Sequence, residues 1–457
     1  MKKSIFREYD IRGVVERDLN PEVVQAIGQA VGSLAAERGE RQVIVGRDGR
    51  LSSPLLCAAL KAGIRAAGLD VVDLGAVSTP MLYYATHTLS STRSGVMVTG
   101  SHNPPQYNGL KIVLDRIALH GAVIRDLRRR IETGDLRYGH GTEYRADIGA
   151  DYIRCISDRL RLPRACKVVV DCGNAIAAET APALLRALGC EVVELYCEVD
   201  GRFPNHHPDP SAPENLVDLQ AAVRSQQADL GLAFDGDADR LGVVTDAGEI
   251  IWPDRVLMPL AEEVLRRHPG AAVVYDIKCS RHLTALIERL GGQPVLWKTG
   301  HSLIKAKMRE IGALLGGEMT GHFVHADDWF GFDDAFYAAA RLLRLVAGYD
   351  GSSAAFFADY PAGFSTPELR VDMAEGQPAA FMARLAAQAD FGPEARIITL
   401  DGLRVEFPRG WGLVRASNTT PSLTLRFEAD DPAALAAIQS QFQRLLLALD
   451  ANLRLPF

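Results

Sequence analysis

The chain has 457 residues, a formal net charge of −7 and an apolar content of 47%. This length is too great for a single hydrophobic core and indicates several domains of roughly 150 residues each. The negative charge argues against a general nucleic-acid-binding protein, which needs an excess of Lys and Arg on at least one face.

The cysteines and the first residues of the chain predict the cell compartment. The sequence has 7 cysteines and no C-x-x-C pair. An odd number without metal-type spacing is typical of reduced structural thiols, so we expect a cytoplasmic protein. Charged residues fill the segment 1–13 before any apolar run, unlike a signal peptide. No uncharged stretch is long enough to cross a bilayer, and we expect no membrane association.

A βαβ pattern recurs along the first three quarters of the chain. The apolar run 43–45 predicts a strand, the alanine-rich stretch from about Pro54 to Ala67 predicts a helix, and residues 71–74 predict the next strand. The same succession returns from residue 168 and from residue 273. A repeat of about one hundred residues or more is too long for a solenoid and predicts duplicated α/β domains.

Each copy also has a later strand that runs into a polar loop. These strands are predicted over 96–98, 230–234 and 313–315. Ligands of open α/β sheets bind beyond the carboxyl ends of the strands. We therefore expect three domains whose loops converge on one cleft.

The repeat ends near residue 360, where Pro361-Ala362-Gly363 and Pro367 predict a linker. The strands and the helix that follow are typical of an α+β domain. The predicted fold class is therefore α/β, with three related α/β domains that contain mixed sheets and a C-terminal α+β domain around a central cleft. The predicted domains are 1–147, 148–247, 248–360 and 361–457.

The first polar loop is Thr99-Gly100-Ser101-His102-Asn103-Pro104-Pro105. Proline supplies no backbone donor and restricts the residue before it, so the strand must end there. Such a loop presents the Ser101 hydroxyl and backbone N–H groups to a small anion, as a nucleophile or phosphate carrier requires. A solvent-exposed turn is the alternative interpretation.

The second polar loop, Asp235-Gly236-Asp237-Ala238-Asp239-Arg240, alternates carboxylates with small residues. In an extended backbone these carboxylates project to the same side, where they repel one another unless a hard cation such as Mg²⁺ neutralises them. A calcium EF-hand loop needs glycine at position 240, Glu at position 246 and flanking helices, so it fits poorly. A solvated acidic turn remains possible from the residues alone.

Further loops offer groups that bind phosphate or sugar. Arg415 stands close to several hydroxyl and amide side chains, a good composition for a phosphate pocket or simply a polar connection. Carboxylate, hydroxyl and imidazole groups around Met319 could bond sugar hydroxyls. The candidate residues of these loops are Glu318, Thr320, His322, Arg415, Ser417, Asn418, Thr419 and Thr420, with weaker signals from Lys278 and His301. Arg12 and Lys111, which flank the Ser101 loop in sequence, could screen phosphate charge.

Together, a candidate serine, metal ligands, sugar-binding groups and a phosphate pocket describe phosphoryl transfer to and from a phosphorylated sugar. The motifs TGSHNP, DGDADR, GEMTGH and RASNTTP occur in this order with wide spacing. The chain resembles the α-D-phosphohexomutases over essentially its whole length, most closely the bacterial phosphomannomutase/phosphoglucomutase group. The resemblance implies four domains, the last of which closes over the cleft.

The resemblance also implies roles for individual residues. It makes Ser101 the phosphoserine, whose phosphate joins Asp235, Asp237 and Asp239 in binding Mg²⁺. Arg12, His102, Lys111 and His301 are the candidates for charge stabilisation or proton transfer. The implied substrate-binding residues are Tyr9, Arg12, Arg240, Lys278, His301, Glu318, Thr320 and His322 for the cleft and sugar, and Arg415, Ser417, Asn418 and Thr419 for the phosphate that does not react.

The resemblance predicts interconversion of hexose 1- and 6-phosphates of mannose or glucose through a hexose 1,6-bisphosphate, which would also act as activator. Phosphosugars are then the partners, nucleic acid is not, and the chain is expected to be a monomer or a weak homo-oligomer. Two departures are Thr320, where serine is usual, and Ala238, where glycine is common. A phosphoglucosamine mutase, for which Gln at position 319 is more typical, a serine-dependent sugar phosphatase and a non-catalytic phosphosugar sensor are the alternatives.

Overall fold

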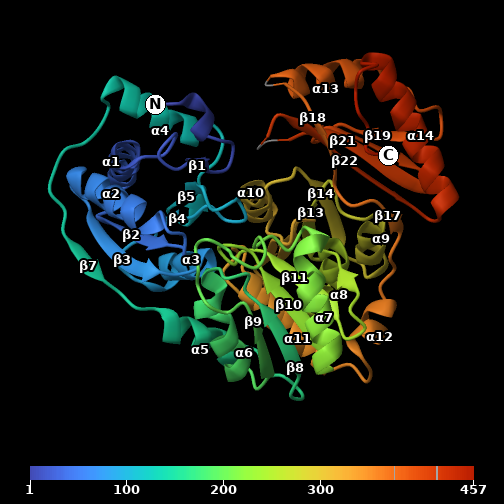
Figure 1. Ribbon diagram of the computed structural model, residues 1–457, viewed down its shortest axis with the longest axis horizontal. Coiled ribbons are helices and arrows are strands. Elements are labelled where there is room, and N and C mark those ends of the chain that lie inside the picture. The colour runs from blue at the N-terminus through green and yellow to red at the C-terminus, as the bar shows by residue number, and fades with distance from the viewer. Residues whose placement is uncertain (375, 418–419) are drawn as a thin grey trace.

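The computed structural model describes residues 1–374, 376–417 and 420–457. They form four sheets, each with helices packed against it, which follow one another along the chain (Figure 1). Three mixed sheets precede an antiparallel sheet, so the predicted fold class is confirmed.

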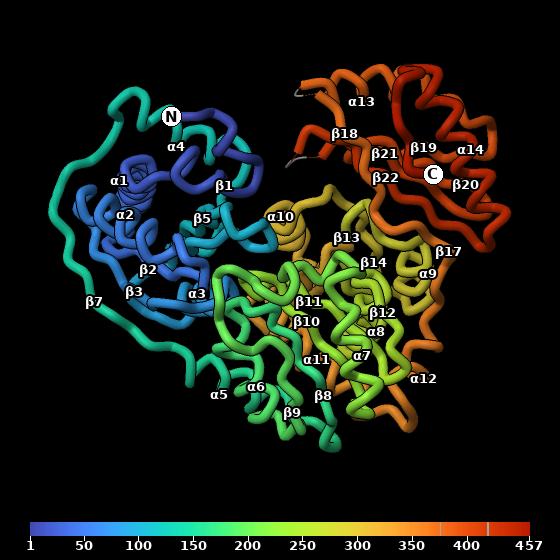
Figure 2. Tube along the Cα trace, in the orientation of Figure 1, coloured from blue at the N-terminus to red at the C-terminus, as the bar shows by residue number. Residues whose placement is uncertain are grey.

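The first sheet has the strand order β1-β5-β4-β2-β3-β7, with β6 beside β5. Its elements are β1 (Ile11–Val14), α1 (Pro21–Glu37), β2 (Gln42–Arg47), α2 (Ser53–Ala66), β3 (Asp70–Ala76), α3 (Thr79–Thr88), β4 (Gly95–Val98), β5 (Tyr107–Leu114), β6 (Ile117–Ala118), α4 (Ala122–Thr133) and β7 (Glu143–Arg145), after a 3-10 turn at Lys3–Ile5. The segment from α4 through β7 runs along the outer edge of this part of the molecule (Figure 2).

The second sheet has the order β12-β11-β10-β8-β9. Its elements are α5 (Gly149–Arg159), β8 (Lys167–Asp171), α6 (Ala181–Ala187), β9 (Glu191–Leu195), α7 (Val217–Gln226), β10 (Leu230–Phe234), β11 (Leu241–Thr245) and β12 (Ile250–Ile251), with 3-10 turns at Ile176–Glu179 and Pro213–Leu216.

The third sheet has the order β14-β13-β15-β16. Its elements are α8 (Pro253–Arg267), β13 (Ala272–Asp276), α9 (Arg281–Arg289), β14 (Gln293–Trp297), α10 (His301–Ile311), β15 (Leu315–Gly317), β16 (Phe323–His325), α11 (Ala335–Ala347) and α12 (Ser353–Ala358).

The internal repeat predicted from the sequence is present in these three sheets. Each has two neighbouring parallel strands joined through a helix, then a third parallel strand, then an antiparallel one: β3-β2-β4-β5, β9-β8-β10-β11 and β14-β13-β15-β16. The three polar loops therefore follow the equivalent strands β4, β10 and β15.

One of these three strands differs from the prediction. β15 covers Leu315–Gly317, whereas 313–315 was predicted. The glycines that looked like loop residues are in the sheet because helices lie directly on them. A Cβ at Gly316 would come within 2.4 Å of Met308 of α10, and one at Gly317 within 2.8 Å of Leu257 of α8.

The fourth sheet is antiparallel, in the order β17-β22-β21-β20-β19, with β18 also beside β22. Its elements are β17 (Phe364–Ser365), β18 (Leu369–Asp372), α13 (Gln377–Gln388), β19 (Arg396–Ile398), β20 (Leu403–Phe407), β21 (Gly410–Ala416), β22 (Ser422–Ala429) and α14 (Pro432–Leu449). The predicted linker thus contains a short strand, β17, which pairs with β22.

Candidate active site

The Ser101 loop is held in an unusual backbone conformation by buried side chains of the first domain. Ser101 has φ +49°, in the left-handed region that β-branched and bulky residues avoid. The backbone N–H of Ser101 donates a hydrogen bond to the Thr99 hydroxyl at 2.8 Å. The Arg50 guanidinium donates to the Ser101 carbonyl at 2.5 Å and to the Pro104 carbonyl at 2.7 Å. Asp48, 3.2 Å from Arg50, balances that charge, so the loop is positioned before any ligand arrives.

The loop after β10 brings three carboxylates to Ser101. Carboxylate oxygens of Asp235, Asp237 and Asp239 all lie within 4.8 Å of one another and are buried. Ser101 Oγ donates to Asp235 Oδ2 at 2.9 Å. The prediction that these aspartates share one side of an extended backbone was wrong, because the segment is a turn in which Ala238 has φ +63°. Ala238, which stands where glycine is common in the family, thus takes a backbone conformation that glycine adopts with less strain.

The two loops touch through their backbones. A Cβ at Gly236 would lie 2.1 Å from the Ser101 carbonyl oxygen, so only glycine permits this approach. Thr79, at the start of α3, donates from its hydroxyl to Asp237 Oδ2 at 2.5 Å and from its N–H to the Asp237 carbonyl at 3.0 Å. The serine and the carboxylates thus belong to one closely packed unit built from two domains.

The charge of the carboxylates is only partly balanced. Lys111 of β5 donates to Asp237 Oδ2 at 2.6 Å and to Asp239 Oδ2 at 2.5 Å. Burial opposes charge on this amine, yet Asp237 and Asp239 raise its pKa above the ordinary value. Burial and the neighbouring carboxylates raise the pKa of Asp235. Asp237 Oδ1 and Asp239 Oδ1 are buried without a hydrogen-bond partner among the described residues.

This donor set fits a hard divalent cation. Three carboxylates and a serine oxygen are the all-oxygen ligands that Mg²⁺ prefers, and the two buried oxygens without partners are the acceptors that a cation would satisfy. A second possible metal group, Asp239 with two histidines and Asp333, fits Mg²⁺ less well, because two of its four ligand atoms are imidazole nitrogens, which suit softer cations.

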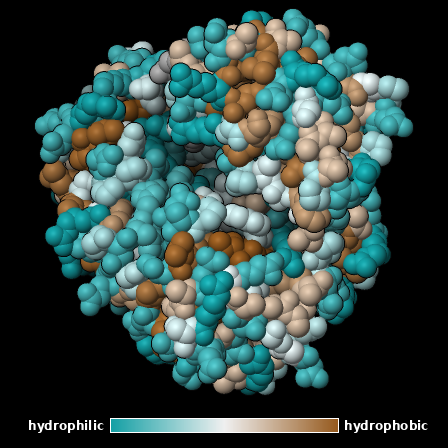
Figure 3. All heavy atoms as spheres, turned by 45° about the vertical axis from the view of Figure 1, so that its right-hand side comes forward, coloured by the Kyte–Doolittle hydropathy of each residue, from teal (hydrophilic) through white to brown (hydrophobic). Residues whose placement is uncertain are grey.

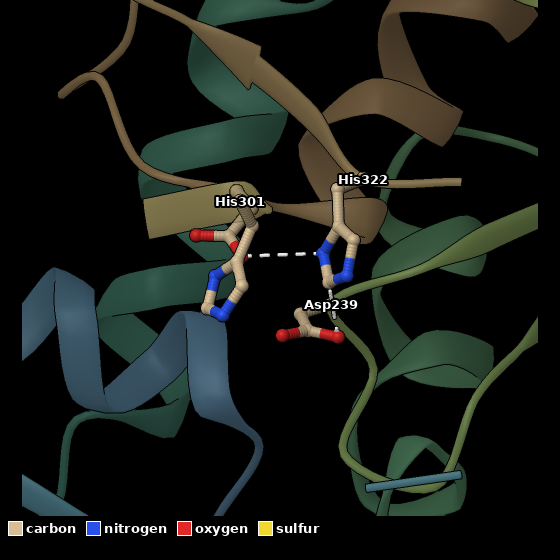
Figure 4. A group of neighbouring side chains, drawn as sticks. Asp239, His301 and His322 are labelled. Atoms are coloured by element: carbon tan, nitrogen blue, oxygen red, sulfur yellow. Dashed lines mark ion pairs between the residues drawn. The ribbon is translucent and has the colours of Figure 1, made fainter. Parts of the chain in front are cut away.

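Two histidines from the third domain, His301 and His322, lie near Asp239 (Figure 4). The His301 and His322 rings stack with centroids 4.9 Å apart and an angle of 13° between them. His322 Nδ1 lies 3.7 Å from Asp239 Oδ1, and Arg240 donates to His322 Nε2 at 3.1 Å. Burial lowers the pKa of His301 to about 4, so its imidazole is neutral near pH 7.

Asp333, which the sequence analysis missed, lies behind both histidine rings. Its Oδ2 is 2.8 Å from His301 Nδ1 and 3.2 Å from His322 Nδ1, and its side chain is fully buried. Burial opposes its ionisation, but Lys305 and His301 bring its pKa well below the ordinary range. Its signal in the sequence was the Asp333-Asp334 pair before an apolar helix, where Asp334 is the N-cap of α11.

Arg12 and His102 adjoin the Ser101 loop. Arg12 of β1 is buried and donates to Asn103 in the loop. His102 Nδ1 lies 3.2 Å from Ser101 Oγ. Burial, together with the positive charges of Arg240 and Arg12, brings the pKa of His102 well below its usual range. His102 is therefore next to the candidate nucleophile, and Arg12 contacts another residue of the same loop.

The sugar-binding candidates lie after β15. Glu318 is buried, its pKa is raised by burial, and its Oε1 accepts from the Gly300 N–H at 2.5 Å. Tyr9, from the first domain, donates to the Thr299 carbonyl at 2.7 Å. Thr320 is half-buried in the turn between Glu318 and His322. The structure therefore places Tyr9 and Glu318 against the neighbouring residues Thr299 and Gly300.

The remaining candidates lie at the junction with the fourth domain rather than beside Ser101. Lys278 donates to Glu368 Oε2 at 2.9 Å; its pKa is raised, since Glu368 and Asp276 outweigh burial. Arg415 of β21 donates from Nε to Asp401 Oδ2 at 3.1 Å, and Asp401 Oδ2 also accepts from the Thr299 N–H at 3.0 Å. The Ser417 hydroxyl accepts from the Thr420 N–H at 3.2 Å. Asn418 and Thr419 lie outside the described residues.

A hollow opens at the centre of one face of the molecule (Figure 3). No helix within the described ranges combines the length and the apolar character needed to span a membrane.

Four family models match the chain in succession. They are the phosphoglucomutase/phosphomannomutase alpha/beta/alpha domains I, II and III, over residues 3–137, 150–248 and 252–362, and the C-terminal domain of the same family, over residues 368–445.

Individual relatives cover the whole chain. A phosphomannomutase/phosphoglucomutase of Pseudomonas aeruginosa is 54% identical over 99% of this chain and 98% of its own length. The crystal structure of a phosphoglucomutase/phosphomannomutase family protein from Burkholderia thailandensis has a TM-score of 0.96, 48% identity and full coverage of both chains. An N-acetylphosphoglucosamine mutase of Aspergillus fumigatus, solved with GlcNAc-6P and magnesium, shares the fold at a TM-score of 0.60 and 15% identity, over 97% of this chain and 96% of its own.

Proposed function

The chain belongs to the phosphoglucomutase/phosphomannomutase family, and from this membership we infer that it interconverts the 1-phosphate and the 6-phosphate of mannose or glucose. The observation that carries the inference is the match of four successive family models along the chain, together with a relative of that activity at 54% identity. The protein is therefore an isomerase of carbohydrate metabolism, a phosphomannomutase/phosphoglucomutase.

We propose Ser101 as the residue that carries the phosphoryl group. The free hydroxyl of a hexose phosphate attacks the phosphorus, the bond from phosphorus to Ser101 Oγ breaks, and the hydroxyl proton passes to a nearby base. The product is a hexose 1,6-bisphosphate. After this intermediate turns around, Ser101 Oγ takes the other phosphoryl group, which leaves the isomeric hexose monophosphate. The buried hydroxyl beside Asp235 supports this assignment.

Asp235, Asp237 and Asp239, with Ser101, are the residues that would hold Mg²⁺. The cation, when bound, would neutralise charge on the transferring phosphoryl group. Lys111, already in contact with two of these carboxylates, supplies a positive charge from the protein itself. Arg12, which contacts Asn103 of the Ser101 loop, would supply another.

The proton of the attacking hydroxyl needs a base that is itself unprotonated. His301 meets this condition near pH 7, and the Asp333 carboxylate beside its Nδ1 would stabilise the imidazolium that forms. His102 is also neutral but is 3.2 Å from the serine oxygen, where it would orient the Ser101 hydroxyl.

Substrate binding is divided between two loops. Glu318, Thr320 and His322, with Tyr9, Arg240 and Lys278, would bond the sugar hydroxyls and line the cleft. Arg415, Ser417, Asn418 and Thr419 would bind the phosphate that does not react. A single phosphate pocket must then accept the substrate in two orientations, because the reacting and resting phosphates exchange places in each cycle.

Partners and location follow from the same assignment. Small phosphosugars are the substrates, a hexose 1,6-bisphosphate would act as activator, and we expect neither nucleic acid nor a membrane as partner. The seven cysteines are all free thiols, which agrees with a cytoplasmic protein. A monomer or a weak homo-oligomer stays our prediction for the assembly.

A coupled assay tests the proposal. Turnover of glucose 1-phosphate and mannose 1-phosphate is expected to need Mg²⁺, to stop with EDTA and to rise with catalytic hexose 1,6-bisphosphate. Comparison with glucosamine phosphate decides the alternative of a phosphoglucosamine mutase. Release of inorganic phosphate without isomerisation would instead indicate a phosphatase, and binding without turnover a sensor.

The variant Ser101→Ala tests the phosphoserine. We expect a loss of turnover of about 10³-fold or more, because no other described group occupies the place of this hydroxyl, with thermal unfolding unchanged. Undiminished turnover in this variant would refute the mechanism.

A further inference from the structure

A cavity of about 550 Å³ lies between the first and third domains, apart from the site described above. It is lined by the last turns of α3 and α10, by the β5–β6 hairpin and by the segment before α11. The first residues of the same two helices, Thr79 and His301, lie in the candidate active site. The cavity and the active site are therefore at opposite ends of α3 and α10.

The rim of the cavity carries an excess of positive charge. Arg93, Arg116 and Arg309 stand on it, and Asp115, the acidic residue among its lining, pairs with Arg93 at 3.2 Å. Arg116 donates to the Thr86 carbonyl at 3.0 Å, and Arg309 to the Arg116 carbonyl at 3.2 Å. Within the described part of the chain neither of these two guanidinium groups pairs with a carboxylate, so each can bind an anion.

Aromatic rings line the wall beneath the rim. The Phe330 and Phe332 rings are parallel within 1°, with centroids 6.2 Å apart, and the His87 ring lies 5.2 Å and 5.6 Å from them. Burial and the charges of Arg116 and Arg309 lower the pKa of His87 to about 4, so the imidazole is neutral near pH 7. Such a wall favours contact with a planar aromatic ring of a ligand over contact with sugar hydroxyls, which would find no hydrogen-bond partner on it.

We propose that this cavity binds a small anion that carries an aromatic ring, for which a nucleoside monophosphate is a suitable representative. The anion would contact Arg116 and Arg309, and the ring would pack against Phe330, Phe332 and His87. The volume of the cavity lies within the usual range for sites that enclose small organic ligands.

A bound ligand would act on the active site through Lys305. This lysine lines the cavity, lies 4.5 Å from the centroid of the Tyr83 ring, and holds Asp333 at 2.5 Å. Asp333 in turn contacts both His301 and His322. An anion near Lys305 competes with Asp333 for its charge, so occupancy is expected to change turnover by several-fold. This kinetic effect rests on the proposed function, whereas binding does not.

Nuclear magnetic resonance of the His87 ring in the full chain measures occupancy of this cavity directly. Adenosine 5′-monophosphate is expected to shift the ring signals saturably and to raise the pKa of His87, since an added anion offsets the two arginines. Adenosine alone and inorganic phosphate alone are expected to bind at least about tenfold more weakly, because each lacks one half of the contacts. No saturable shift with the nucleotide at millimolar concentration, or equal affinity for inorganic phosphate, overturns the proposal.

Variants separate this cavity from the phosphosugar site. Arg309→Gln and Arg116→Gln are each expected to raise the dissociation constant about tenfold. Arg309 is exposed on α10, so its variant is expected to fold even if the other does not. The controls are Arg384→Gln, at an exposed position on α13, and Arg415→Gln, and neither should change the affinity. If Arg415→Gln lost nucleotide binding while Arg309→Gln kept it, the ligand would lie in the phosphosugar site and the proposal would be refuted.

Discussion

The interfaces among the first three domains differ in kind from the interface between the third and the fourth. One continuous buried apolar cluster extends from Ile44 of β2 to Phe357 of α12 and includes side chains of all three α/β domains. The fourth domain has its own cluster, which runs from Val371 to Leu446. A small cluster of Ile277, Trp411 and Leu413 joins the fourth domain to the third.

Arginines supply most of the remaining contacts at that second interface. Arg404 donates to the carbonyls of Ile277 at 2.7 Å and Cys279 at 2.9 Å, and its guanidinium lies 3.9 Å from the centroid of the Trp411 ring. Arg426 pairs with Asp254 of α8 at 3.0 Å. Breaking polar contacts of this kind costs less free energy than exposing a large apolar face, because water can replace the lost hydrogen bonds.

The two kinds of interface separate the groups proposed for phosphoryl transfer from the group proposed for phosphate binding. Groups proposed to make and break bonds, such as Ser101 and His301, lie in the fused part, where an error in position is costly. Arg415, proposed to hold the phosphate that does not react, lies on the fourth domain, beyond the more polar interface. A movable fourth domain would admit the substrate and then exclude water during transfer.

Asp333→Asn is expected to have the largest effect among the variants that test this division. The amide cannot balance Lys305 or stabilise an imidazolium at His301, so kcat should fall about 10²-fold while KM changes little. The matched control is Asp334→Asn. Asp334 is equally buried, but it accepts hydrogen bonds from Tyr152, Trp329 and the N-terminus of α11. Its variant should therefore lower the melting temperature and change kcat little. Equal losses of kcat in the two variants would contradict the role given to Asp333.

Arg415→Ala should act on binding instead. Loss of a guanidinium that holds phosphate is expected to raise KM by about tenfold or more, with kcat changed less than about threefold. Steady-state assays in both directions give the two constants. Arg370→Ala on β18, which removes an exposed arginine of the same sheet, is the control. A fall in kcat alone would assign Arg415 to the transfer step.

Arg404→Gln tests the interface itself. Losing the bonds to two carbonyls of the third domain should favour an open arrangement, so KM is expected to rise several-fold and the radius of gyration in solution scattering to increase. Saturating substrate should restore the compact form. Arg396→Gln, on the exposed part of β19, should change neither quantity. An unchanged radius of gyration would show that this arginine does not hold the fourth domain closed.

His87→Gln should have the smallest effect and should appear only in acid. His87 lies between the first and third domains, against Phe330 and Phe332. Its pKa in the folded protein is about 4, below the unfolded value of about 6.5, so the unfolded chain takes up the proton first as the pH falls. The free energy of unfolding should therefore fall between pH 6.5 and pH 4, by up to about 3 kcal/mol from this group.

Urea unfolding at pH 7 and at pH 4.5 measures this effect. The His87→Gln variant should lose less stability than the wild type on acidification, whereas His140→Gln, at an exposed position, should behave like the wild type. Identical losses in the wild type and in His87→Gln would show that the interface between the first and third domains does not respond to this histidine.

Local sequence signals were enough to predict the repeated architecture. Strand, helix and closing glycine recur within short windows, and the polar loops after β4, β10 and β15 stand out from the apolar strands before them. The family resemblance through four motifs was confirmed by the four family models. Which residues carry out each step stays a proposal.

Contacts between distant parts of the chain could not be predicted. Thr79 bonds Asp237 across 158 residues, and Arg50 holds the Ser101 loop from 51 residues away. In a single sequence such residues look like ordinary helix-start or surface residues. The backbone of the Asp loop was also predicted incorrectly, because an alternating pattern does not reveal a turn whose shape depends on close approach to Ser101.

The pairing of β17 with β22 has a consequence for biosynthesis. β17 lies in the segment between the third and fourth domains, yet its partner residues Glu428 and Ala429 are made near the end of translation. The first three domains can therefore complete their shared apolar core while this tether still has no partner strand. The nascent chain would complete the three domains that carry Ser101 and His301 first and the fourth domain last, so a chain truncated before Ser422 would lack the strand that pairs with β17 and could not enclose its substrate.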